Sequence, residues 1–151
     1  MRPREISPEY QAVAAWLRER VLPWRTLTIA IDGVDHAGKS SLGRFLSWQL
    51  GMPVIEADCT LKSDSREVTH DTELMGRLLA ERHNMNRPVI IEGVFVLRAL
   101  ANLNIEPDFV IGVRAKGRRG SLNLQYAFRK YRSAYIRAKT PDYQFNWVPT
   151  E

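Results

Sequence analysis

Residues 33–40 have the spacing of a phosphate-binding loop, in which two glycines stand five positions apart and a Lys-Ser pair follows the second. The backbone N–H groups of such a loop point inward and form a concave nest for anions. Lys39 can reach the terminal phosphates of a nucleotide, and the Ser40 hydroxyl can bind Mg²⁺. The sequence therefore predicts that the phosphates are held by Gly33, Val34, Asp35, His36, Ala37, Gly38, Lys39, Ser40 and Ser41.

Asp35 and His36 are unusual because they place two bulky side chains in the middle of this loop. One hypothesis is that both side chains face solvent, away from the phosphate. The other is that Asp35 lies near the reacting phosphate or Mg²⁺. His36 is not expected to be a metal ligand or a catalytic base, since no second His or Cys lies near it in the sequence.

Two carboxylates stand at the ends of apolar runs. Asp58 follows the run at 53–56 and could accept the proton of an attacking hydroxyl or help to hold Mg²⁺; a structural role in a loop or helix cap is the alternative. Glu92 ends the run at 88–93, and an acid there is costly unless it meets a cation or a donor. Glu92 is therefore predicted to lie near Mg²⁺ or a substrate hydroxyl, with a partnered structural carboxylate as the alternative.

Positive charge is concentrated near the C-terminal end. Nine of the 22 Lys and Arg lie between 109 and 141, a window without Asp or Glu, although the whole chain has 17 acidic residues and a net charge of +5. Arg114, Arg118 and Arg119 are candidates to stabilise a transferring phosphoryl group from a lid-like segment at 114–120, with a solvated basic face as the alternative. Tyrosines at 126, 131 and 135 have helical spacing and are expected to pack rather than to stack on bases.

The elements that must position these residues alternate along the chain. Apolar runs at 27–31, 53–56, 88–93 and 108–113 are predicted strands, and 143–148 is a short last one. The predicted helices run from 8 to before Pro23 and over 39–50, 71–84, 94–103 and 121–138. Strands that are apolar throughout and alternate with helices indicate an α/β fold with a parallel sheet covered on both faces. In such sheets a ligand binds beyond the carboxyl ends of the strands, where the candidate residues stand.

Length and composition fit one soluble globular domain spanning 1–151. The single Cys59 excludes an intramolecular disulfide and suits a reducing cytoplasm, which is the expected location. No apolar run approaches the roughly 20 residues needed to span a membrane, so no membrane partner is expected. Oligomeric state does not follow from the sequence, and a homodimer is left open.

Four segments in this order, "IAIDGVDHAGKSSL", "VIEADCTL", "VIIEGVFVL" and "DFVIGVRAKGRRGSLNLQY", resemble the uridine kinase and nicotinamide riboside kinase group of P-loop kinases. The loop is also similar to that of thymidylate kinases. The resemblance implies a three-layer P-loop NTPase fold with a five-stranded parallel sheet, and ATP and Mg²⁺ as cofactors. It further implies that Asp58 is the catalytic base, that Glu92 lies near the substrate or metal, and that the lid arginines are Arg114, Arg118 and Arg119.

The leading hypothesis is an ATP-dependent kinase that transfers the γ-phosphate to a hydroxyl of a nucleoside-like or other small metabolite. Lys39, Asp58 and the lid arginines are its expected catalytic residues, and Ser40, Asp58 and Glu92 its expected metal-binding residues. Because the stretch between Asp58 and the next helix is shorter than in the family, a catalytically weak ATP-binding regulatory module stays open as the alternative. Nucleic-acid binding through 114–139 is less favoured, since no recognised nucleic-acid motif accompanies the basic residues.

Overall fold

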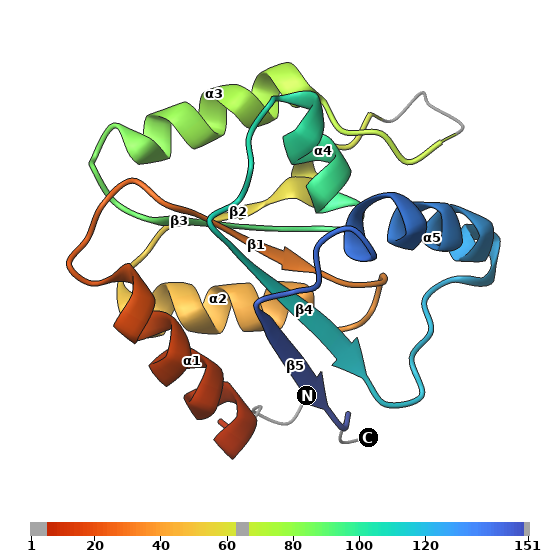
Figure 1. Ribbon diagram of the computed structural model, residues 1–151, viewed down its shortest axis with the longest axis horizontal. Helices are drawn as coiled ribbons and strands as arrows, with labels where there is room; N and C mark the ends of the chain where they lie inside the picture. The colour runs from red at the N-terminus through yellow and green to blue at the C-terminus, as the bar shows by residue number, and fades with distance from the viewer. Residues whose placement is uncertain (1–5, 63–66, 150–151) are drawn as a thin grey trace.

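A computed structural model describes residues 6–62 and 67–149 and contains a five-stranded parallel sheet with the order β2-β3-β1-β4-β5 (Figure 1). The predicted fold class is confirmed. The prediction that 1–151 form one domain includes residues outside the described ranges and stays a prediction. The strands are β1 (Thr28–Asp32), β2 (Val54–Glu56), β3 (Val89–Glu92), β4 (Phe109–Ala115) and β5 (Tyr143–Trp147).

The central strands are apolar throughout because helices cover both faces of the sheet. Every residue of β1 and β3 is buried. Helices α1 (Pro8–Val21) and α2 (Lys39–Leu50) pack on one face, as Figure 1 shows. The opposite face is covered by α3 (Thr72–His83), α4 (Val96–Asn102) and α5 (Gln125–Tyr131).

The prediction of one regular helix over 121–138 is wrong. A 3₁₀ turn, η2 (Leu122–Leu124), precedes α5, and a π-helical turn, η3 (Arg132–Ile136), follows it. In η3 the N–H of Arg137 donates to the carbonyl of Arg132, five residues earlier, so the helix widens directly after Tyr131. The packing predicted for the tyrosines holds for Tyr131, which is buried, and fails for Tyr126, which is 66% exposed.

Among the described residues, no helix is both long and apolar enough to cross a membrane. The carboxyl ends of the parallel strands meet at one edge of the sheet, and the loop after β1, the 3₁₀ turn η1 (Ala57–Thr60) after β2 and the segment after β4 all start there. This edge brings the candidate residues together.

Candidate active site

The loop between β1 and α2 is held closely against its neighbours. A Cβ on Gly33 would stand 2.7 Å from the carbonyl oxygen of Val113, so only glycine lets the loop leave β1 beside β4 at this distance. At Gly38 the backbone turns with φ +96° before α2 begins at Lys39. The loop thereby delivers the N-terminus of α2, with its free N–H groups, to the end of the sheet.

The Lys39 side chain is folded into the loop. Its ammonium group is buried and donates to the Val34 carbonyl at 2.7 Å. Burial lowers the pKa of Lys39, while the carboxylates of Asp58 and Glu92 act in the opposite direction. Partial desolvation strengthens the attraction between this cation and any anion that reaches it.

Ser40 and Glu92 form the centre of the site. The Ser40 hydroxyl donates to Oε1 of Glu92 at 2.9 Å. Glu92 is 1% exposed, and its Oε2 has no hydrogen-bond partner among the described residues. Burial raises the pKa of Glu92, and the Ser40 hydrogen bond reduces this shift. A buried carboxylate with a free oxygen beside a serine hydroxyl is a donor set suited to a divalent cation.

Asp58 reaches this centre from the other side. It is the second residue of η1, is exposed, and its Oδ1 accepts a hydrogen bond of 3.4 Å from the N–H of Val94. The charge of Asp58 raises the pKa of both Lys39 and Glu92, so the three groups lie within electrostatic range of one another. The structure thus brings together the residues predicted from three strand ends.

His70 is a neighbour of this group that the sequence did not reveal. It is buried, and its Nε2 has no partner among the described residues. Burial lowers the pKa of His70, while Asp58 raises it and Arg98 lowers it. An isolated antiparallel backbone bridge between Leu61 and His70 brings the imidazole close to Asp58. Such a bridge cannot be predicted from the spacing of residues in the sequence.

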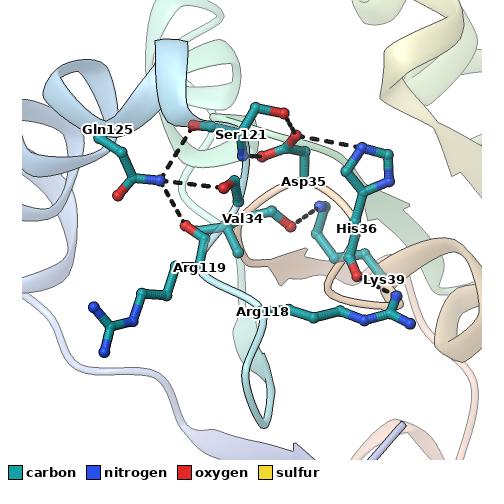
Figure 2. Close-up of polar contacts among 9 residues, drawn as sticks. Val34, Asp35, His36, Lys39, Arg118, Arg119, Ser121 and Gln125 are labelled. Atoms are coloured by element: carbon teal, nitrogen blue, oxygen red, sulfur yellow. Dashed lines mark hydrogen bonds and ion pairs between the residues drawn. The ribbon is translucent and has the colours of Figure 1, made fainter. Parts of the chain in front are cut away.

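The side chains of Asp35 and His36 lie in different environments. The Asp35 carboxylate accepts hydrogen bonds from the N–H of Ser121 at 2.8 Å and from the Ser121 hydroxyl (Figure 2). Burial raises the pKa of Asp35, but the hydrogen bonds from Ser121, together with the charge of His36, leave the pKa below its ordinary value. The hypothesis of a solvent-facing pair is therefore wrong for Asp35, whereas the His36 side chain is 79% exposed.

The lid arginines separate into two groups. Arg118 donates to the His36 carbonyl at 2.9 Å, and its guanidinium lies 5.7 Å from the centre of the Trp147 ring. Arg119 extends away from the loop in Figure 2, and Arg114 is exposed on β4. Of the three predicted arginines, only Arg118 contacts the loop in this arrangement.

Trp147, at the end of β5, covers the loop and was not found by sequence reasoning. Its indole N–H donates to the Ala37 carbonyl at 2.6 Å. A Cβ on Gly38 would stand 2.7 Å from the Trp147 ring. The loop is therefore fixed from three directions, by β4, by the segment containing Arg118 and Ser121, and by β5.

A pocket of about 560 Å³ lies between the start of the loop, the ends of β4 and β5, and α5. Asp32 lies in its wall, buried, and its carboxylate accepts a hydrogen bond of 2.7 Å from the Tyr131 hydroxyl. That hydroxyl in turn accepts from the N–H of Leu97 at 3.0 Å. Burial raises the pKa of Asp32 to about 6. Lys39, Ser40, Asp58 and Glu92 are not among the pocket's lining residues.

Comparisons with known proteins place the fold. No protein-family model matches the chain, and no curated protein matches it. A possible uridine kinase from Bacillus stearothermophilus is similar in structure, with a TM-score of 0.60 and 19% sequence identity over 91% of this chain and 99% of that one. A protein described as a fructose transport system kinase from Silicibacter sp. TM1040 has a TM-score of 0.54 and 18% identity over 91% of each chain.

These neighbours share the parallel sheet and its flanking helices with this chain at identities that establish the fold alone. The resemblance inferred from the four sequence segments is confirmed at that level. The chain has the fold of the P-loop kinases.

Proposed function

We propose that the protein is an ATP-dependent small-molecule kinase, which transfers the γ-phosphate of ATP to a hydroxyl of a nucleoside-like or other small metabolite. The observation that carries the proposal is the convergence of Lys39, Ser40, Glu92 and Asp58, from three strand ends, at the mouth of a phosphate-binding loop. The structural likeness to a possible uridine kinase supports the choice of a small-molecule acceptor.

The residues present fit both implied cofactors. The loop and the N-terminus of α2 offer backbone N–H groups and a buried ammonium to the phosphates of ATP. Ser40 and Glu92 fit Mg²⁺, because the unpartnered Oε2 of a buried carboxylate needs a cation or a donor. Asp58 can join them directly or through water. The metal would neutralise charge on the transferring phosphate.

The protein's own groups have distinct roles in this scheme. Asp58 accepts the proton of the acceptor hydroxyl, since it is the exposed carboxylate of the group and can meet an incoming ligand. Lys39 stabilises charge on the phosphates, and Arg118 adds positive charge from the lid while holding the loop through His36.

The test is an ADP-release assay with ATP and Mg²⁺ over a panel of nucleosides and sugars, including uridine and fructose. Lys39→Ala should lower turnover at least ~10²-fold, the scale of a lost transition-state donor. Asp58→Asn should lower turnover by about 10²–10⁴-fold, the range of a lost general base. Lys130→Ala is the matched control, because Lys130 is exposed on α5 and contacts the Tyr126 ring only through a cation–π interaction. Near-normal turnover of Lys39→Ala would contradict the proposal.

A catalytically weak ATP-binding regulatory module is the second candidate, favoured by the short acceptor side. There the chain passes from η1 to α3 through a segment closed by the Leu61–His70 bridge. Tight ATP binding without transfer to any member of the panel would select this candidate.

A further inference from the structure

A smaller cavity, here called the α4 pocket, lies beside the end of α4 and apart from the phosphate-binding loop. Its walls come from α4, the loop that leads from α4 to β4, the start of β4, and the chain from η3 to Lys139 (Figure 1). Its volume of about 380 Å³ is within the range of sites for small organic ligands. Of the residues that the structure describes, none lines both this cavity and the pocket at the start of the phosphate-binding loop.

The interior of the α4 pocket opens onto the apolar core. Leu97 on α4 is 9% exposed and Val110 on β4 is 4% exposed, and both belong to the core on this face of the sheet. Ile105 and Pro107, from the loop between α4 and β4, line it as well and are half-buried. These side chains form no hydrogen bonds, so they favour a ligand with a largely apolar body.

Two neutral polar side chains line the same pocket. The Tyr135 hydroxyl and the Asn104 side-chain amide have no hydrogen-bond partner among the residues that the structure describes. Small-molecule sites typically combine an apolar lining with a few polar groups that fix the orientation of the ligand. The α4 pocket therefore suits a ligand that carries one hydroxyl or amide group on its apolar body.

The charged groups of the α4 pocket neutralise each other. The ammonium nitrogen of Lys139 lies 3.4 Å from Oε1 of Glu106, and both side chains are among the lining residues. Within the described part of the chain, no other charged residue lines the pocket. An ionised ligand group would lose hydration here without meeting an unpaired counter-ion, so the pocket favours an uncharged ligand.

The walls of the α4 pocket include residues that hold Tyr131. The N–H of Leu97 donates to the Tyr131 hydroxyl at 3.0 Å, and the rings of Tyr131 and Tyr135 have centroids 5.1 Å apart. The Tyr131 hydroxyl donates to Asp32 at 2.7 Å, and Asp32 directly precedes Gly33 at the start of the phosphate-binding loop. A ligand that displaces Leu97 or Tyr135 therefore acts on a hydrogen bond at the base of that loop.

We propose that the α4 pocket binds a small, uncharged, largely apolar ligand with one hydroxyl or amide group, and that its occupancy alters the phosphate-binding loop through Tyr131. The binding site rests on its own geometry. Only the expected effect on nucleotide affinity rests on the proposed function.

Two probes that share a two-ring body and differ in charge, 2-naphthol and 2-naphthoate, test the pocket. Each is titrated into the protein, and binding is followed by NMR of the Leu, Ile and Val methyl groups. 2-Naphthol should shift the methyl signals of Leu97, Ile105 and Val110 but not that of Leu46, which is buried on the opposite face of the sheet. It should bind at least ~10-fold more tightly than 2-naphthoate, whose carboxylate finds no unpaired cation.

A pair of alanine variants locates the bound probe. Ala101→Trp places a large ring in the pocket from an exposed position on α4 and should abolish the methyl shifts. Ala80→Trp is the matched control, because Ala80 is exposed on α3 and does not line the pocket. The proposal would be overturned by the absence of shifts in the wild type, by equal shifts in Ala101→Trp, or by equal affinity for the two probes.

Calorimetric titration with ADP and Mg²⁺ tests the link to the loop. Saturating 2-naphthol should change the ADP affinity of the wild type at least ~5-fold, the lower end of typical coupling between two sites. Tyr131→Phe should remove this change, because it lacks the hydroxyl that joins Leu97 to Asp32. An unchanged ADP affinity in the wild type, or an equal change in Tyr131→Phe, would overturn the link. If the protein bound no ADP, the proposed function would fail, whereas the methyl shifts would still decide whether the pocket binds its ligand.

Discussion

The burial of the Asp32 carboxyl group should give the protein a measurable dependence of stability on pH. Burial raises the pKa of Asp32 from 3.8 to about 6. Between these two values the unfolded chain has released the proton that the folded chain still holds. The free energy of unfolding therefore falls as pH rises, by about 1.4 kcal/mol per pH unit. From about pH 4 to about pH 7 the loss due to this carboxyl group should be about 2 kcal/mol.

Asp32→Asn removes the titrating group at similar volume. Urea denaturation of both proteins at several pH values gives the difference in their free energies of unfolding. Between about pH 4 and about pH 7 the free energy of unfolding of the wild type should fall by about 2 kcal/mol relative to that of Asp32→Asn. A pH-independent effect of the substitution on stability does not alter this change. Tyr131→Phe is the second variant. Because the Tyr131 hydrogen bond lowers the pKa of Asp32, its loss should move the fall in stability to higher pH.

If the difference in free energy of unfolding between the wild type and Asp32→Asn does not change over this pH range, the reasoning is refuted. It would mean that Asp32 is not buried under α5 in solution, or that water reaches its carboxylate. Direct measurement of the Asp32 pKa by NMR would then give a value near the model-peptide value of 3.8.

Three further perturbations test other contacts. Asp35→Ala should lower the free energy of unfolding, measured by urea denaturation, by about 1–3 kcal/mol. Ser121→Ala should lower it by about half as much, because the N–H of residue 121 still donates to Asp35. Equal losses in the two variants would count against the paired hydrogen bonds. Gly38→Ala should destabilise more than Gly117→Ala, since both glycines have positive φ but only a Cβ at Gly38 meets the Trp147 ring; thermal unfolding compares them, and equal shifts would contradict the contact. Glu92→Gln should leave the fold at least as stable, because it removes a buried charge. In a Mg²⁺ titration, the same variant should raise the Mg²⁺ concentration needed for ADP binding at least ~10-fold. An unchanged Mg²⁺ dependence would show that Glu92 is not part of the proposed metal site.

The parts of the fold that follow from local sequence were predicted well. The buried strands β1 and β3 appear as uninterrupted apolar runs, because both of their faces are covered and no polar alternation remains. The pairing of Ser40 with Glu92 could also be anticipated, since parallel strands bring their carboxyl ends to one edge and register sets Ile31 beside Glu92.

The contacts that the sequence could not predict join distant segments through one side chain. Asp35 finds its partner 86 residues later, at Ser121. Tyr131 bonds to Asp32, 99 residues earlier, and the widened turn η3 begins at the next residue. Helical periodicity describes only local spacing, so it gave one regular helix over 121–138 and no reason for Tyr126 and Tyr131 to differ in exposure.

The contact between Trp147 and Ala37 spans 110 residues and connects the loop to the last strand of the sheet. A ribosome makes the loop early and β5 late, so for most of synthesis the glycine segment is present without the indole that covers it. Nucleotide binding by nascent chains arrested before and after Trp147 should therefore differ. The proposed phosphate-binding loop is encoded near the start of the chain, but its packing is completed only when Trp147, one of the last described residues, has been made.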